Sequence, residues 1–328
     1  MAEYTIFKLK NLTPLHIGTG KENYDFSSDE LSSDTISSAL AAIRAQQGKT
    51  NDIEGFLRSF TVSSAFPFIG DMIFLPRPLG RLDVSVNGQE EHQYRKELKK
   101  IKYIELSLWQ SLITGQHISI EQSQIEKSFL LPLTDALIDT PSSKQVMQRM
   151  SINRDNQKSD PFFFEWQYFA PSAGLYFIVD APKTVTLELQ QLAVELGEIG
   201  LGTDKSVGGG KFEVDTETIH INDADNPTAS MLLSTYIPSQ DELDLLQLNT
   251  ATYSLLHRDG YIAGSNQDQF QHLRKKSIYM FSPGSFFHTL EHLDGKIVDL
   301  RPDWNDNNLH PVFRSGKPFV IQIHNEPI

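Results

Sequence analysis

Residues 182–215, with the sequence PKTVTLELQQLAVELGEIGLGTDKSVGGGKFEVD, contain a predicted helix, a glycine-rich loop and a predicted strand in succession. The apolar residues of the helix recur on one of its faces, at Val185, Leu189, Leu192, Leu196 and Ile199. Pro182 suits the first turn of this helix, and Gly200 suits its C-terminal cap. The strand expected at 211–215 predicts an α+β fold in which the helix returns the chain to a sheet.

The glycine-rich loop, from Gly200 to Phe212, has five glycines and two lysines, a composition that suits the binding of an anion. Glycine tolerates positive φ, and consecutive backbone N–H groups in such a loop can form an anion-binding nest. The loop is not a nucleotide-hydrolysis motif, because it follows a helix instead of opening one and because Asp204 precedes Lys205. The candidate contacts are Gly200, Gly202, Lys205, Ser206, Gly208, Gly209, Gly210 and Lys211. A helix-to-strand connector without a ligand explains the same composition equally well.

A second loop, Leu15–Gly20, follows a predicted N-terminal strand and can form a wall of the same groove. The next helix is expected to begin at Thr35, capped by Ser33 or Asp34, and its first N–H groups can hold a phosphate. His16 can stack on a base or donate to a phosphate, although a lone histidine is more often structural. The candidate residues of this wall are His16, Gly18, Thr19, Gly20, Ser33, Asp34 and Thr35.

Three further segments carry positive charge. Arg149, Ile152 and Arg154 combine charge with apolar side chains, as single-stranded RNA sites do, and a solvated basic loop explains them nearly as well. The segment Arg95–Lys102 is also basic, and the exposed face of a helix is its usual explanation. Arg314 precedes a predicted strand and belongs either to a second phosphate-facing turn or to an ordinary hairpin.

The order of the predicted elements divides the chain into two domains. Residues 1–222 are expected to run strand, helix, strand, insertion, strand, helix, glycine loop and strand. This order predicts a ferredoxin-like (RNA-recognition-type) domain, an antiparallel sheet with helices on one face, with an insertion around 80–160. Residues 223–328 contain further strand candidates, and we expect a smaller ferredoxin-like domain there.

Finer expectations concern individual elements of the first domain. Ala65–Leu75 is expected to form a strand, and Tyr103–Ile113 a helix. Phe162–Tyr168 and Gly174–Val179 are expected to pair as an antiparallel hairpin, because a short segment with proline and glycine separates them.

The composition restricts the chemistry of the chain, which has 328 residues, no cysteine and a formal net charge of −13. Disulfides, thiolate nucleophiles and cysteine metal sites are excluded, and a reducing cytoplasm fits. The N-terminus has no signal-peptide pattern, and no apolar run approaches the ~18 residues of a membrane helix. The histidines lack metal-binding spacing, so neither a metal nor another cofactor is expected. The acidity argues against nucleic acid, unless a local basic groove binds RNA and the acidic surface meets a basic partner.

Several short motifs, in this order and spacing, resemble one known family. They are Pro14–Gly20, Ser33–Leu40, Leu98–Ile104, Ile152–Arg154, Ala173–Phe177, the glycine-rich loop and the tail from His310 to Gly316. With these motifs over nearly its whole length, the chain resembles the RAMP superfamily of CRISPR-associated proteins, specifically subunit four of the type III-A Csm complex. The resemblance implies two ferredoxin-like domains, with a thumb or arm inserted in the first.

The resemblance also implies a function in antiviral defence. Family members bind and cap the 5′ tag of CRISPR RNA, dock the large polymerase-like subunit and contact the first backbone RAMP subunit, and they are not known for catalysis. By position, the glycine-rich loop, His16–Gly20, Ser33–Thr35 and Arg149–Arg154 would hold the tag, with Asn153 standing where the family usually has aspartate.

Two other functions remain open from the residues. One is a metal-independent endoribonuclease that processes precursor RNA, for which His16 or another histidine would act as general acid or base. The other is a protein-only adaptor subunit, which the negative net charge favours.

Overall fold

The computed structural model describes residues 2–18, 24–134, 140–152, 159–262, 270, 273–303 and 309–325. The α-helices are α1 (Ser33–Gln46), α2 (Ile53–Arg58), α3 (Glu91–Leu98), α4 (Leu106–Ile113), α5 (Lys183–Ile199) and α6 (Gln240–Leu245). Two 3-10 turns are η1 (Gln122–Gln124) and η2 (Lys205–Val207). Within the described residues, no helix has both the length and the apolar character that crossing a membrane requires.

Nine strands form one central sheet in the order β13-β1-β12-β3-β4-β6-β9-β8, with β2 pairing beside β3 on β12. These strands are β1 (Ala2–Lys10), β2 (Thr61–Val62), β3 (Phe66–Ile69), β4 (Met72–Pro76), β6 (Tyr103–Glu105), β8 (Ile125–Glu126), β9 (Phe129–Leu130), β12 (Ala173–Asp180) and β13 (Glu213–Ile221). The remaining strands are β5 (Val84–Val86), β7 (Ile118–Ile120), β10 (Ser142–Ile152), β11 (Ser159–Phe169), β14 (Ala229–Leu232), β15 (Leu255–Arg258), β16 (Ile278–Phe281), β17 (Phe286–Phe287), β18 (Ile297–Asp299), β19 (Phe313–Ser315) and β20 (Val320–Ile323).

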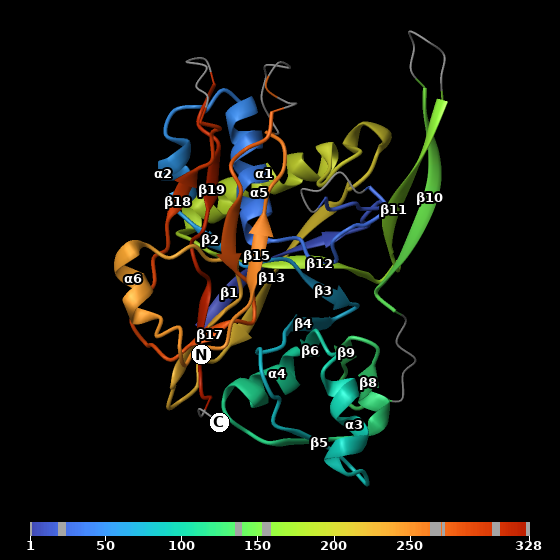
Figure 1. Ribbon diagram of the computed structural model, residues 1–328, viewed down its shortest axis with the longest axis vertical. Helices are drawn as coiled ribbons and strands as arrows, with labels where there is room; N and C mark the ends of the chain where they lie inside the picture. The colour runs from blue at the N-terminus through green and yellow to red at the C-terminus, as the bar shows by residue number, and fades with distance from the viewer. Residues whose placement is uncertain are drawn as a thin grey trace.

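Both faces of the central strands are covered. On one face, Phe7 and Phe177 belong to the apolar cluster that α1 and α5 cover (Figure 1). On the other face, Ile6 and Tyr176 share a cluster with Met231 of the C-terminal half. The strands β1 and β12 therefore lie in the middle layer of three, which explains why β12 is apolar at consecutive positions.

The helix expected after Pro182 is confirmed as α5, with Pro182 at its N-cap and Gly200, at φ +99°, at its C-cap. Leu189, Leu192 and Leu196 are buried, whereas Ile199 is 38% exposed at the end of the predicted stripe. Each buried leucine contributes roughly 1.5–3 kcal/mol. This packing holds the beginning of the glycine-rich loop against the edge of the sheet.

The expected hairpin between Phe162–Tyr168 and Gly174–Val179 is wrong. β11 pairs with β10, and β12 instead pairs with β1 and β3. The physical reason is burial, because the apolar strand β12 is covered on both faces only in the middle of the sheet, between β1 and β3, whereas β11 projects from the body with β10. Glycine at 174 permits the close approach to β1, since a Cβ there would lie 2.3 Å from the carbonyl oxygen of Leu9.

Three local expectations also need correction. Ala65–Leu75 is not one strand, because the chain turns at Gly70, at φ +57°, and forms β3 and β4. The segment 103–113 begins as a strand, β6, which pairs with β4 before α4 starts. The helix α1 starts at Ser33, with Ser32 at the N-cap position, so neither Ser33 nor Asp34 caps it.

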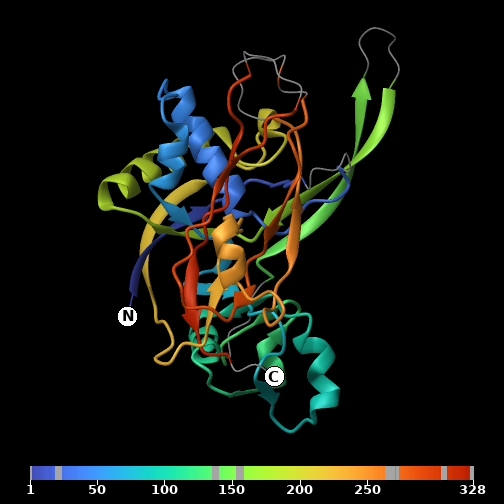
Figure 2. The ribbon, with the colours of Figure 1, turned by 60° about the vertical axis from the view of Figure 1, so that its left-hand side comes forward.

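The residues between β4 and β12 form two parts at opposite ends of the molecule. One part, which we call the lobe (residues 77–131), contains α3, α4 and the parallel pair β5–β7, together with β6, β8 and β9, which extend the central sheet. The other, which we call the arm, is the long antiparallel hairpin of β10 and β11. Figures 1 and 2 show the arm projecting from the body while the lobe lies below it.

The C-terminal half packs as a small β structure on the central sheet. Its three-stranded sheet has the order β17-β14-β20, and two hairpins, β15–β16 and β18–β19, flank it. In the described part of this half, α6 is the one complete helix. A ferredoxin-like domain has two helices, so that arrangement stays a prediction for this half.

A buried ionic cluster joins the two halves at the start of α1. Asp34 has no exposed surface and forms ion pairs with Arg258 of β15, whose Nε lies 3.1 Å from Oδ2, and with Arg314 of β19. Beside it, the hydroxyl groups of Ser33 and Thr235 share a hydrogen bond of 2.8 Å. These contacts fix the C-terminal half against the helix layer.

We expect Asp34→Ala to lower the free energy of unfolding by about 3–5 kcal/mol, because it leaves the buried Arg314 and the half-buried Arg258 without a counter-charge. Urea denaturation followed by circular dichroism measures this loss. Asp215→Ala is the control, since Asp215 forms an exposed ion pair with Lys10 that contributes little to stability. Equal losses in both variants would contradict the role of Asp34 as the link between the halves.

Candidate RNA-binding site

The glycine-rich loop lies directly on the loop that follows β1. The N–H group of Thr203 donates to the carbonyl oxygen of His16 at 3.1 Å, and that of Gly210 donates to Pro14 at 2.9 Å. A third contact comes from Thr13, whose hydroxyl donates to a carbonyl oxygen of the glycine-rich loop at 2.8 Å. Two predicted motifs from distant parts of the sequence therefore form one surface, which we call the loop floor (residues 13–18 and 200–211).

Three glycines of the loop floor are required by close packing. At Gly210, φ is +68° and a Cβ would lie 1.9 Å from the carbonyl oxygen of Leu201. At Gly202 a Cβ would lie 2.3 Å from the carbonyl oxygen of His16, and at Gly209 it would lie 2.5 Å from the ring of Trp166. Close packing alone therefore explains why these three positions are glycine, as expected for a connector without a ligand.

Most N–H groups of the glycine-rich loop donate within the protein. The donors are Gly200, Leu201, Thr203, Val207, Gly208, Gly209, Gly210, Lys211 and Phe212. The expected anion-binding nest is therefore wrong for these nine groups, because a nest needs free N–H groups that point at the ligand. The exposed side chains of Lys205, Ser206 and Lys211 are contacts that this loop offers to an anion.

Two buried aromatic rings at the base of the arm pack against the loop floor. The rings of Phe164 and Trp166, both on β11, lie 4.9 Å apart, and the imidazole of His16 lies 4.4 Å from Phe164. Arg149 of β10 lies over both rings, at 4.6 and 5.3 Å, and its guanidinium forms an ion pair with Asp204. Arg149 therefore ties the arm to the glycine-rich loop.

Large apolar side chains are exposed along the arm and beside its base. The exposed residues are Val146, Met147, Met150 and Phe163 on the arm, and Tyr24 and Phe26 beside its base. Stacking of a nucleic-acid base on an aromatic ring contributes about 1–3 kcal/mol. Apolar side chains outside the core, next to exposed lysines, are what a single-stranded RNA requires from a protein surface.

A cavity of about 250 Å³ at the base of the arm carries further positive charge. Lys102, Lys127 and Lys144 line it together with Asp29. The carboxylate of Asp29 lies 2.7 Å from Lys144 and 3.1 Å from Lys102. Burial acts to raise the pKa of Asp29, but the hydrogen bonds from the two lysines prevail and lower it. Lys144 also lies 3.3 Å from the carboxylate of Glu165, so Lys102 and Lys144 are paired with Asp29 and Glu165, while Lys127 donates to Thr140 Oγ1 at 2.8 Å.

The other predicted site residues lie elsewhere. Ser33, Asp34, Thr35 and Arg314 belong to the ionic cluster that joins the halves, where Arg258 donates to Thr35 Oγ1 at 2.6 Å. Asp34 is 0%, His16 1%, Ser33 4% and Arg314 6% exposed. These four side chains are too buried to contact RNA directly.

The remaining predicted residues either belong to the loop floor or cannot be placed. Gly18 lies in the loop floor, where a Cβ would be 3.8 Å from Thr203. Thr19, Gly20 and Arg154 lie outside the described residues, and only the backbone of Ile152 is described.

Sequence reasoning missed Trp166, Phe164 and Asp204. Residues 162–168 contain five aromatic side chains in seven positions, but Phe164 and Trp166 are 1% and 5% exposed, so they support the site from the core and do not face RNA. No local signal indicated Asp204, because its partner Arg149 comes from the arm and approaches only in the folded protein.

Comparison with known proteins identifies the family of the chain. The family model of the RAMP superfamily matches residues 8–213, more than half of the chain, and the model of the CRISPR Csm4 C-terminal domain matches residues 225–323. The chain therefore belongs to the RAMP superfamily and, within it, to the Csm4 proteins of type III-A CRISPR complexes.

Relatives cover nearly the same length. The CRISPR system Cms protein Csm4 of Streptococcus thermophilus is 27% identical over 325 residues, which span 94% of this chain and 95% of the relative. The protein of the same name from Thermococcus onnurineus (strain NA1) is 27% identical over 256 residues, 76% of this chain and 80% of the relative.

Solved structures show the same fold. A chain in the crystal structure of a Csm1-Csm4 cassette in complex with cA4 has a TM-score of 0.64 at 18% identity and covers 98% of both chains. A chain in the Csm3-Csm4 subcomplex of the type III-A CRISPR-Cas interference complex has a TM-score of 0.64 at 17% identity and covers 99% of this chain and 100% of that chain.

We expect Gly210→Ala to unfold the loop floor, because a Cβ would lie against the backbone of Leu201 and φ is positive. Gly208→Ala is the matched control, since φ there is also positive, at +85°, but no atom lies within 4 Å of the added Cβ. The control should cost only the backbone strain of about 1–2 kcal/mol. Thermal unfolding of both variants measures the difference, and equal midpoints would contradict the packing role of Gly210.

Proposed function

We propose that this chain is a non-catalytic subunit of a type III-A CRISPR interference complex that binds and caps the 5′ tag of CRISPR RNA. The observation that carries the proposal is the contact of the loop floor with the arm through Arg149 and Asp204. This contact sets the exposed Lys205 and Lys211 beside a hairpin with exposed aromatic and aliphatic side chains. Such a surface binds a single strand by its phosphates and by the flat faces of its bases.

The distribution of charge supports this proposal despite the net charge of −13. Asp204, the acid beside Lys205 in the sequence, is already paired with Arg149, so it does not cancel the lysine charge. The lysine-lined cavity at the base of the arm extends the positive surface. An acidic remainder of the molecule repels RNA that does not fit this surface.

The geometry favours holding RNA over cutting it with His16. The imidazole is buried, and its Nδ1 lies 2.8 Å from the carbonyl oxygen of Glu165. Its ring also packs on Phe164. A general acid or base must reach the 2′-hydroxyl group of the RNA, which a buried imidazole engaged with a backbone carbonyl cannot do without leaving its site.

We also propose the partners, domains and location that this function requires. Csm4 chains of similar fold were solved in a Csm1-Csm4 cassette and a Csm3-Csm4 subcomplex, so this chain would dock the large polymerase-like subunit and the backbone RAMP subunit in the cytoplasm. Its domains would be 1–222 and 223–328. The strand order β13-β1-β12-β3, with α1 and α5 on one face, supports a ferredoxin-like first domain.

Reversing the charge of the two exposed lysines of the glycine-rich loop tests the RNA site. We expect Lys205→Glu/Lys211→Glu to reduce the CRISPR RNA that copurifies with the assembled complex by about tenfold, because two phosphate contacts become repulsive. Sequencing the 5′ ends of the copurified RNA measures both the amount and the uniformity of the tag.

The control is Lys183→Glu/Lys296→Glu, which makes the same change in net charge on exposed residues outside the loop floor. It should retain the RNA of the wild type. Unchanged RNA with one defined 5′ end in the loop variant would refute the proposal, and equal loss in both variants would reduce it to a general effect of charge.

A further inference from the structure

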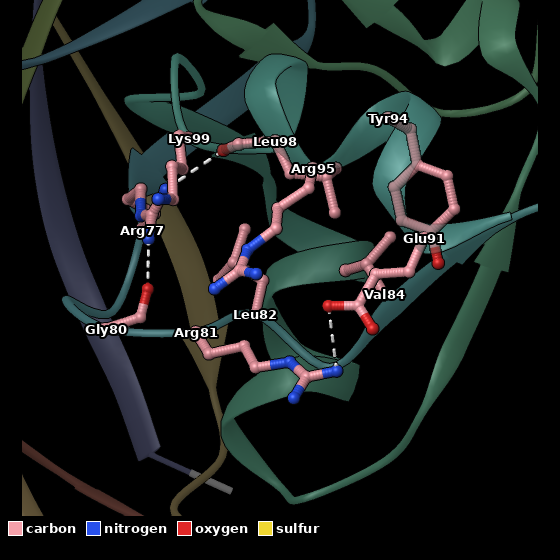
Figure 3. A pocket seen from close by; sticks show the side chains of 10 residues that line it. All are labelled: Arg77, Gly80, Arg81, Leu82, Val84, Glu91, Tyr94, Arg95, Leu98 and Lys99. Carbon is pink, nitrogen blue, oxygen red and sulfur yellow. Dashed lines mark hydrogen bonds and ion pairs between the residues drawn. The ribbon is translucent and has the colours of Figure 1, made fainter.

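The lobe contains a separate cavity of about 340 Å³, formed by the connection from β4 to β5 and by α3 (Figure 3). Four cationic side chains line it: Arg77, Arg81, Arg95 and Lys99. The lobe lies away from the arm in both views of the molecule (Figures 1 and 2). It shares no lining residue with the loop floor or with the lysine-lined cavity at the base of the arm, although Lys102 and Lys127 of the lobe line that second cavity.

The positive charge of this region stands out from the rest of the chain. Residues 77–102 contain seven lysines and arginines against four aspartates and glutamates, whereas the whole chain has a net charge of −13. A surface of one sign on a protein of the opposite sign attracts ligands by its local potential. The ligand of this cavity is therefore expected to be an anion.

Arg77 is held in place without being neutralised. Its guanidinium donates to the carbonyl oxygen of Leu98 at 3.0 Å, to that of Pro78 at 3.3 Å and to that of Gly80. Burial lowers its pKa, but an arginine begins so high that it stays protonated. Carbonyl oxygens satisfy its hydrogen bonds but carry no full negative charge, so a fixed positive charge remains in the wall.

Arg95 and Lys99 bring two more charges to the same opening. In the described part of the chain, neither forms an ion pair with a carboxylate, whereas Arg81 pairs with Glu91 at 3.0 Å. Figure 3 shows the guanidinium of Arg95 between those of Arg77 and Arg81. Cations at the C-terminal end of α3 suit the helix dipole, but this effect does not account for Arg77, which comes from the preceding loop.

The floor of the cavity is apolar. Leu82, Val84 and Tyr94 line it and are each less than 8% exposed. A pocket with a buried apolar floor and a few convergent polar groups is typical of a small-molecule site, and its volume falls in the usual range. The ligand should therefore contain both an anionic group and a flat or apolar group.

We infer that this cavity binds a nucleoside phosphate, with the phosphate between Arg95 and Lys99 and the nucleoside on the apolar floor. Arginine forks match phosphate oxygens in pairs. The nucleotide comes either from an RNA chain or from the free pool, and the two sources share this chemistry. The inference does not depend on RNA binding at the loop floor.

The test uses the full chain and two probes, a fluorescent ATP analogue and a short 5′-phosphorylated single-stranded RNA. The variant Arg95→Glu/Lys99→Glu should raise Kd about tenfold or more for at least one probe, since each charge-assisted contact contributes roughly an order of magnitude. The control Lys96→Glu/Lys100→Glu makes the same charge change on exposed residues of the same segment that do not line the cavity. It should change Kd less than about threefold.

Each measurement is repeated in the Lys205→Glu/Lys211→Glu background, so that the lobe is tested whether or not the loop floor binds RNA. Loss of affinity for ATP indicates that the nucleotide comes from the free pool. Loss of affinity for the RNA alone indicates that it is part of an RNA strand. Equal loss in test and control variants overturns the site. Competition by tripolyphosphate or by poly-glutamate as strong as that by ATP also overturns it, because charge alone would then explain binding.

Discussion

The N–H groups of Gly210 and Thr203 donate to the carbonyl oxygens of Pro14 and His16, and the first half of the molecule depends on this contact. It fixes the return of the chain from α5 to β13 against the loop that leaves β1. A side chain at Gly210 would strike Leu201, so the contact exists only with glycine there. The two joined loops form the surface that Trp166 and Arg149 of the arm contact.

The same contact changes how the glycine-rich loop would bind RNA. Its composition suggested a nest of free N–H groups, but nine of these groups donate within the protein. The backbone therefore supplies a rigid support, and the exposed lysines supply the charge. This division also resolves the conflict with an acidic chain, since a few cations freed from local carboxylates are sufficient where the surface is preorganised.

Much of the first half could be predicted from the sequence. The helix α5 and its glycine cap follow from the leucine spacing and from Gly200, because both signals are local. The pairing of β11 could not be predicted, since its partner β10 and the cover of β12 come from distant segments. At the site, Lys205 and Lys211 were found by composition, whereas Phe164 and Trp166 were taken for ordinary strand residues because their neighbours were unknown.

The sequence by itself determined the α+β class, the helices α1 and α5, the glycine-rich loop and the family to which the motifs belong. The tertiary structure decided that Asp34 and Arg314, which looked like candidates for RNA contact, are buried together as the link between the halves. It also decided that His16 supports Phe164 instead of facing solvent. The reason is that residue type and spacing set local conformation, while exposure and charge pairing depend on which distant segments meet.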